Sequence, residues 1–169
     1  MMPLEAPLDC ARCPRLVASR RAVVNGFGPL TASVMVVAQA PGKSEEVYDP
    51  PQPLVGWSGK QLREKLMPLA NIDPDAVRYE NIVRCKPPKG KGGDEPPTAA
   101  EIAACRPFLE AAITACQPQI IVTLGAPALR WFLPKAKLAV VHGQPQETEH
   151  GLVVAMHHPA AAAPGRNTK

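Results

Sequence analysis

The sequence is poor in aromatic residues and has no long apolar stretch. Phe, Tyr and Trp make up 4% of its 169 residues, so a site that needs an aromatic stacking surface has few candidates. No run of about 18 apolar residues occurs without a charge or a proline, so no membrane span is predicted. The N-terminus, MMPLEAPLDC, lacks the basic start and apolar core of a secretory signal. We therefore expect a cytoplasmic protein.

The length and the charge fit one small domain. A chain of 169 residues is long enough to bury a core, so we expect residues 1–169 to form a single domain and a monomer. The net charge of +4 suits an anionic partner. A balance this mild is also common among proteins that never meet nucleic acid, so the charge alone leaves the partner open.

Short β-branched runs alternate with helical patterns along the chain. Strands are predicted at 33–38, 77–83, 119–124 and 152–155. Helices are predicted at 15–23, 59–69, 98–116 and directly after Gly125. This alternation favours an α/β, three-layer αβα fold with a short, mainly parallel, four-stranded sheet. Residues 86–97, rich in Pro, Gly and Lys, are predicted to be an exposed and mobile loop.

Polar side chains follow three of the predicted strands. Gln39 comes directly after the first strand, Asn81 lies near the end of the second, and His158 follows the fourth. The carboxyl ends of parallel strands share one edge of a sheet, and ligands bind at that edge in such folds. The sequence therefore predicts that these three side chains form a single site.

Four cysteines form a close pair near the N-terminus and two more far downstream. Cys10 and Cys13 have the spacing C-x-x-C. Cys85 follows a predicted strand, and Cys105 lies in a predicted helix. Without an export signal, we expect reduced thiols or metal ligands, and we predict one metal centre. The spacing leaves zinc, an iron–sulfur cluster and ordinary buried cysteines as alternatives, and Cys116 is interpreted as a core residue.

Six short motifs occur in a fixed order along the chain. They are C-x-x-C, AQAPG at 38–42, PLVGWSGKQL at 53–62, NIVRCKPP at 81–88, EIAACRPFL at 101–109 and HPAA at 158–161. In this order, and with the four cysteines, they resemble the family 4 uracil-DNA glycosylases and the related domain of phage-type DNA polymerase-like proteins. The resemblance extends from Cys10 to about Ala161.

This resemblance implies an enzyme and a cofactor. The activity would be removal of uracil from DNA, by hydrolysis of the N-glycosidic bond of a deoxyuridine flipped out of the helix. The expected partner is DNA that contains uracil. The family carries a structural [4Fe–4S] cluster, and for this reason iron–sulfur is preferred to zinc. Its ligands would be Cys10, Cys13, Cys85 and Cys105.

The resemblance also implies roles for the residues of the predicted site. Asn81 would read the base, because a carboxamide can donate to uracil O4 and accept from N3–H, whereas cytosine presents the reverse pattern. His158 would contact uracil near O2 and stabilise negative charge on the leaving base. Glu45 would orient the attacking water or stabilise a cationic sugar. Contacts to uracil are further expected from Gln39, Ala40 and Leu54.

The sequence departs from the family pattern at positions that bear on activity. Gln39 stands where the family has a glutamate, and Leu54 replaces a phenylalanine that stacks on uracil. Family members also usually continue through another helix after the histidine motif. These departures leave a catalytically weak or inactive DNA-binding relative as an alternative. A zinc-stabilised binding module without a nucleic-acid role is the alternative from another class.

Basic residues flank the cysteines in the sequence. We expect them to form a surface that neutralises DNA phosphates, which would make binding fall steeply with salt. Solubilising charge scattered over the surface is the alternative. The residues are Arg12, Arg15, Arg20, Arg21, Lys86, Lys89 and Lys91.

Overall fold

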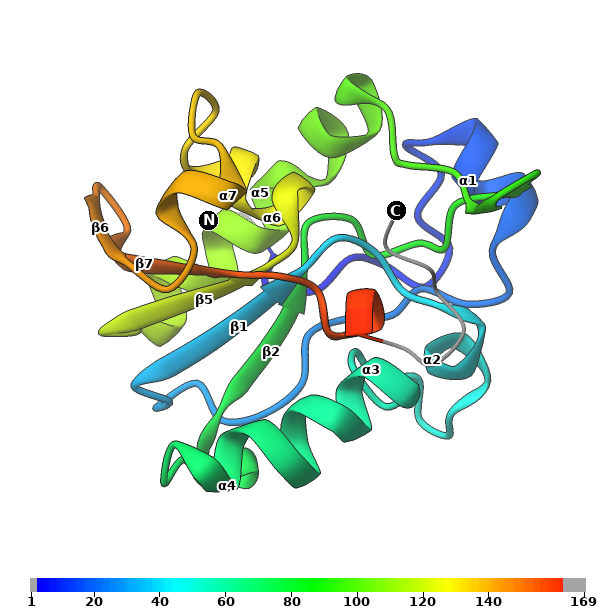
Figure 1. The fold of residues 1–169 in the computed structure, drawn as a ribbon. Helices are drawn as coiled ribbons and strands as arrows, with labels where there is room; N and C mark the ends of the chain where they lie inside the picture. The colour runs from blue at the N-terminus through cyan, green and yellow to red at the C-terminus, as the bar shows by residue number, and fades with distance from the viewer. Residues whose placement is uncertain (1–2, 163–169) are drawn as a thin grey trace.

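A five-stranded sheet forms the centre of the protein in a computed structural model that describes residues 3–162 (Figure 1). The strands lie in the order β2–β1–β5–β7–β6, with all neighbours parallel except the antiparallel pair β6–β7. Their bounds are β1 Val34–Ala38, β2 Arg78–Asn81, β5 Ile120–Leu124, β6 Pro145–Thr148 and β7 Gly151–Met156. The mainly parallel α/β sheet is therefore confirmed.

The predicted count of four strands was wrong, because the edge strand β6 was missed. The sequence of β6, PQET, contains no Val, Ile, Leu or aromatic residue, and its side chains are alternately exposed and half-buried. It belongs to the sheet because it forms a hairpin with β7, in which Thr148 pairs with Gly151. Gly151 has a φ of 102°, a left-handed conformation that glycine adopts without strain at such a tight turn.

Alternate side chains of β1 pack against helices on opposite faces of the sheet, so the three layers follow from the packing. Met35 and Val37 lie in one core with residues of α5 (Ala99–Cys116) and α6 (Ala126–Phe132). Val36 and Ala38 face the other core, which contains side chains of the helical segment 57–69. This period of two is expected for a strand buried on both faces.

The helices match their predictions where the sequence carries a clear signal. The capping box is present at the start of α5, where Thr98 Oγ1 accepts from the Glu101 N–H at 3.2 Å and the Glu101 carboxylate accepts from the Thr98 N–H at 2.7 Å. The predicted helix 59–69 is a continuous helical segment made of α3 (Trp57–Lys60), a π-helical stretch (Gln61–Leu66) and α4 (Met67–Leu69). The other α-helices are α1 (Pro14–Ser19), α2 (Lys43–Val47) and α7 (Leu138–Val141).

Two predicted elements end early because the chain makes long-range contacts instead. α1 stops at Ser19, not at Val23, and the Val24 N–H donates to the Arg84 carbonyl at 2.8 Å. β2 stops at Asn81, and the next N–H, of Ile82, donates to the Ala38 carbonyl at 2.9 Å. The predicted loop 86–97 contains a short hairpin, β3 (Lys89–Gly90) with β4 (Gly93–Asp94).

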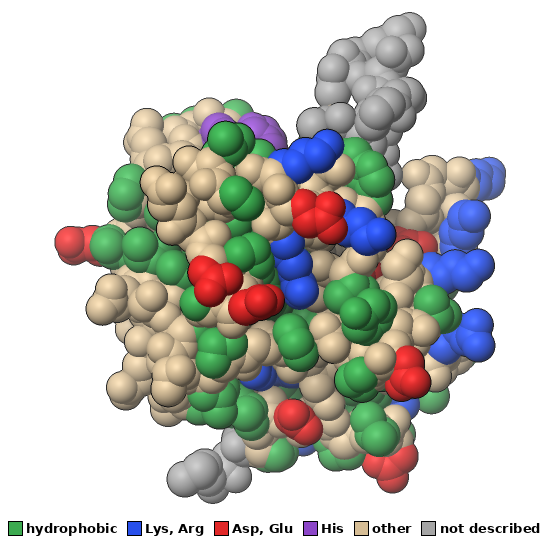
Figure 2. Space-filling view, turned by 90° about the horizontal axis from the view of Figure 1, so that it is seen from below, with side chains coloured by type: hydrophobic (Ala, Val, Ile, Leu, Met, Phe, Trp, Pro, Cys, Tyr) green, Lys and Arg blue, Asp and Glu red, His purple; other side chains and the backbone are tan. Residues whose placement is uncertain are grey.

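Several Lys and Arg side chains gather along the right-hand edge of the molecule in Figure 2, the side on which Figure 1 places α1 and the hairpin. Two of the predicted surface cations, Arg15 and Lys86, form ion pairs with acidic side chains of the same chain. Arg15 pairs with Glu95 and Glu101 at 2.8 and 2.7 Å, and Lys86 pairs with Asp94 at 2.9 Å.

Among residues 3–162, no helix combines the length and apolarity needed to cross a bilayer.

Candidate active site

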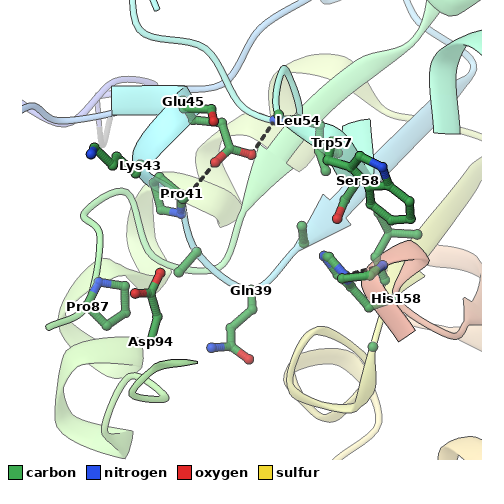
Figure 3. Close-up of a pocket in the computed structure, with 18 of the residues that line it drawn as sticks. Gln39, Pro41, Lys43, Glu45, Leu54, Trp57, Ser58, Pro87, Asp94 and His158 are labelled. Atoms are coloured by element: carbon green, nitrogen blue, oxygen red, sulfur yellow. Dashed lines mark hydrogen bonds between the residues drawn. The ribbon is translucent and has the colours of Figure 1, made fainter. Parts of the chain in front are cut away.

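A cavity of about 440 Å³ opens at the carboxyl ends of β1 and β5 (Figure 3). Its wall contains the turn after β1 (38–42), the start of α2, Leu54, the start of α3, and His158. The structure therefore brings Gln39, Ala40, Glu45, Leu54 and His158 together from distant parts of the sequence. This is the edge of a parallel sheet at which ligands bind.

The carboxylate of Glu45 connects two loops of the cavity wall. One oxygen accepts from the Gly42 N–H, and the other accepts from the Leu54 N–H at 3.1 Å. Burial raises the pKa of Glu45 above its usual value, and the two backbone N–H groups oppose that rise. The side chain is thus held in one orientation, with a carboxyl group that is easier to protonate than an exposed one.

Leu54 gives the cavity an aliphatic wall. Its side chain is only 3% exposed and packs in the same core as Val36 and Leu62. Its φ of 57° is unusual for a residue with a side chain, and the bond from its N–H to Glu45 helps to hold it. A Cβ atom on Gly59 would lie 1.7 Å from the Leu54 carbonyl oxygen, so only glycine allows α3 to pack this closely.

One hydrogen bond of His158 indicates which ring nitrogen acts as an acceptor. The Ala160 N–H donates to His158 Nδ1 at 3.2 Å, so Nδ1 acts as the acceptor. In a neutral imidazole the other nitrogen then carries the proton, which makes Nε2 a donor. Figure 3 shows His158 at the cavity beside Trp57 and Ser58. The ring can therefore donate one hydrogen bond without being charged.

Asn81 lies at the expected sheet edge but does not line the cavity. It pairs with Ala38 in the sheet and is 4% exposed, and it is not among the described residues that line the cavity. It shares a sheet face with Tyr79, which packs against the helical segment 57–69. Its Nδ2 has no hydrogen-bond partner within residues 3–162. Of the three residues predicted to form one site, Gln39 and His158 therefore line the cavity and Asn81 does not.

Several residues of the cavity wall were not anticipated. Asp94 lies in β4 and lines the cavity, and its ion pair with Lys86 connects the β3–β4 hairpin to the segment after β2. No local pattern identifies such a residue, because the pairing depends on the fold of the whole loop. Trp57 could have been found, since it is one of only two tryptophans and follows Leu54 within one motif. Further lining residues are Lys43, Ser58 and Pro87.

The four cysteines of the predicted metal centre line a second, much smaller cavity. Cys10 and Cys13 come from the N-terminal segment, Cys85 from the chain after β2, and Cys105 from α5. Burial raises the pKa of Cys105 to about 11 and also raises those of Cys13 and Cys85. The part of the chain that the structure describes has no group of three or more His, Cys, Asp or Glu side chains arranged to hold a single metal ion.

Two arginines accompany these thiols, and the fifth cysteine is separate. Arg20 Nη1 donates to Cys85 Sγ at 3.2 Å, and Arg84 also lines the small cavity. Cys116 is buried in the core between α5 and the sheet, where its thiol donates to the Ala32 carbonyl at 3.3 Å. It is therefore a core residue, as expected.

Sequence comparison decides the family. The family model for the "Uracil DNA glycosylase superfamily" matches residues 25–169. The chain belongs to this superfamily. It is 36% identical over 154 residues to a type-4 uracil-DNA glycosylase of Thermotoga maritima, an alignment that covers 89% of this chain and 76% of the relative. It is 31% identical over 167 residues to the type-4 enzyme of Sulfurisphaera tokodaii, with 94% and 73% covered.

Membership of the uracil-DNA glycosylase superfamily confirms the resemblance given by the six motifs. A type-5 uracil-DNA glycosylase of Pyrobaculum aerophilum is also similar, with 29% identity over 184 residues that cover 90% of this chain and 79% of the relative. Residues of four of the motifs that carry the resemblance line the large cavity: AQAPG, PLVGWSGKQL, NIVRCKPP and HPAA. In this superfamily member, the roles of individual residues remain predictions.

Proposed function

We propose that this protein is a uracil-DNA glycosylase that hydrolyses the N-glycosidic bond of a deoxyuridine flipped out of DNA. The observation that carries the proposal is the cavity of about 440 Å³ at the carboxyl edge of the sheet, which gathers Gln39, Glu45, Leu54 and His158. A base inside a duplex is inaccessible to such a concave site, so the nucleotide must be extruded to enter it. The type-4 names of the relatives support the same activity.

His158 would stabilise the leaving base. When the bond between C1′ and N1 breaks, its electron pair stays on uracil, and negative charge spreads toward O2. A neutral imidazole whose Nε2 carries the proton can donate a hydrogen bond to that oxygen. The bond from the Ala160 N–H to Nδ1 supports this tautomer and holds the ring in place.

Glu45 would act on the sugar side of the reaction. The sugar develops positive charge as the bond breaks, and a water molecule then adds to C1′ and loses a proton. A carboxylate can orient this water, accept its proton and stabilise the positive charge. The two backbone N–H groups that bind Glu45 support the role because they fix the carboxylate beside the cavity. Its raised pKa brings the group closer to neutral pH, which suits a general base.

Asn81 is proposed to read uracil at the sheet edge. Buried polar groups nearly always have hydrogen-bond partners, so its Nδ2, unpartnered among the described residues, is an exception that a ligand can explain. Uracil O4 would accept from this amide. The proposal requires the side chain, or the wall formed by Ala38, to shift when the base enters.

The small cavity is proposed to hold a [4Fe–4S] cluster through Cys10, Cys13, Cys85 and Cys105. Four thiolates are the usual ligands of such a cluster. They do not need to converge on one point as the ligands of a single ion do, because the cluster itself fills the space between them. When bound, the cluster would be structural and would join the N-terminal segment to α5 and to the loop after β2.

Release of free uracil from a defined oligonucleotide tests the proposed function. The purified chain is incubated with an oligonucleotide that contains one deoxyuridine, and with the same oligonucleotide that contains thymidine, and the released base is measured by mass spectrometry. We expect uracil from the first and no thymine from the second. His158→Leu should reduce the rate strongly, whereas His150→Leu, at a histidine that packs against Trp131 and Phe132, should not. DNA binding without release would instead support the inactive relative.

A further inference from the structure

Trp57 is the only Phe, Tyr or Trp among the described residues of the large cavity's wall. Trp57 is 44% exposed, so part of its indole is accessible to a ligand. Neither aromatic rings nor cationic side chains contact its indole within residues 3–162. A π-face of the indole is thus available next to the cavity.

The second tryptophan, Trp131, shows the opposite arrangement. It is 5% exposed, and its ring packs against Phe132, His150 and the guanidinium of Arg106. Trp131 therefore has a structural role in the core. Trp57 makes no such ring or guanidinium contact within residues 3–162, and it lines the cavity.

Contacts of α3 with its neighbours position the backbone of Trp57. Trp57 is the first residue of α3, and α3 is held against Leu54 by the close approach at Gly59. Gly56, directly before it, approaches Ser44 of α2, where an added Cβ would be only 3.4 Å from the serine Cβ. α3 also contacts the turn 159–162 that follows His158. These contacts position Trp57 in the cavity wall, and Figure 3 shows its indole beside His158.

We propose that Trp57 stacks on the extruded uracil, a role that rests on the proposed function of the cavity. Every nucleobase has a π-face, and stacking on an aromatic side chain is a common way to hold an extruded base. Leu54 is packed into the core and presents only aliphatic atoms, so it cannot supply this interaction. A base whose O2 is held by His158 would lie within reach of the neighbouring indole.

Tryptophan fluorescence tests the stacking without requiring catalysis. The full-length protein is titrated with a duplex that contains 2′-fluoro-2′-deoxyuridine, whose glycosidic bond is cleaved slowly, and with the same duplex that contains a tetrahydrofuran abasic analogue. Because Trp131 is buried, we expect the uridine duplex to quench the emission of Trp57 more than the abasic duplex does. In Trp57→Leu this difference should disappear. Equal quenching by the two duplexes in the unmodified protein would overturn the proposal.

The kinetics give an independent readout. Trp57→Leu should lower kcat/KM for uracil release by roughly 5- to 150-fold, the range expected from loss of one base–aromatic stack. Trp57→Phe keeps a ring and should retain most of the activity. Leu69→Ala, at an apolar side chain that is 84% exposed at the other end of the same helical segment, should behave as the unmodified protein. Melting temperatures measured on all variants separate stacking from stability.

The outcomes distinguish the two proposals. Differential quenching without any uracil release would support stacking and overturn the glycosylase activity. Normal uracil release with no differential quenching, and with full activity in Trp57→Leu, would overturn stacking and leave the glycosylase proposal intact. Absence of both signals would overturn both proposals.

Discussion

Loss of the buried carboxylate at Glu80 should destabilise the fold strongly. Glu80 is fully buried between Arg78 and Arg84, with N–O distances of 2.8 and 2.9 Å. Arg84 in turn donates to the Phe108 carbonyl and lines the cysteine cavity. In Glu80→Gln, the carbonyl oxygen of the new amide can still accept from Arg78. Its NH₂ group would then face the guanidinium of Arg84 and leave that charge buried and unpaired.

The expected cost follows from this geometry. Removing one partner of a buried ion pair costs about 3–5 kcal/mol, and one retained bond to Arg78 places Glu80→Gln near the lower end of that range. An exposed pair offers a matched control. Arg106 and Glu110 lie 3.6 Å apart with side chains 41% and 47% exposed, so Glu110→Gln should change the free energy of unfolding by at most about 0.5 kcal/mol.

Urea unfolding followed by circular dichroism measures both variants under identical conditions. A shift of the midpoint at constant slope gives the change in the free energy of unfolding. We expect a large decrease in the free energy of unfolding for Glu80→Gln and almost no change for Glu110→Gln. Similar losses in the two variants, or a loss below about 1 kcal/mol for Glu80→Gln, would refute the view that the Arg78–Glu80–Arg84 cluster supports the fold.

Three further substitutions test the site. Because burial raises the pKa of Glu45, its carboxylate should become protonated at a pH above the usual glutamate range, and the rate of uracil release should fall as the pH drops through that range. Glu45→Gln should have a lower rate that lacks this decrease at acidic pH. If the rate of Glu45→Gln still falls at acidic pH, another group is responsible for that decrease. Asn81→Asp should lower the preference for uracil over cytosine by about 1–3 kcal/mol in a competition assay, and an unchanged preference would place base reading elsewhere. Cys85→Ser should lower the iron content and the melting temperature more than it lowers the turnover of the folded fraction. Cys116→Ser, at a core cysteine, should retain its iron. Equal iron content in the two variants would exclude Cys85 as a ligand.

The predictable parts of the fold are those that local chemistry determines. The apolar runs that became β1, β5 and β7 supply buried side chains to the sheet, and their β-branched, apolar composition makes them recognisable without any knowledge of their neighbours. The capping box of α5 is equally local, since Thr98 and Glu101 satisfy each other's backbone N–H groups. β6 has no such signal, because its polar residues join the sheet only through backbone pairing with β7.

The candidate site was predictable in its location and less so in its details. Strand ends identified Gln39 and His158, because parallel strands share a carboxyl edge. The burial of Asn81 away from the cavity depends on tertiary packing, which strand periodicity does not reveal. Asp94 enters the wall through an ion pair across a hairpin, and such a contact follows from tertiary structure alone.

A crystal structure with a duplex that contains 2′-fluoro-2′-deoxyuridine would test the central claim most directly. The account predicts an extruded uracil in the cavity at the carboxyl ends of β1 and β5, with O2 about 2.7–3.2 Å from His158 Nε2 and the ring stacked on Trp57. Uracil bound at another surface, or a duplex bound with its uracil still stacked in the helix, would contradict it.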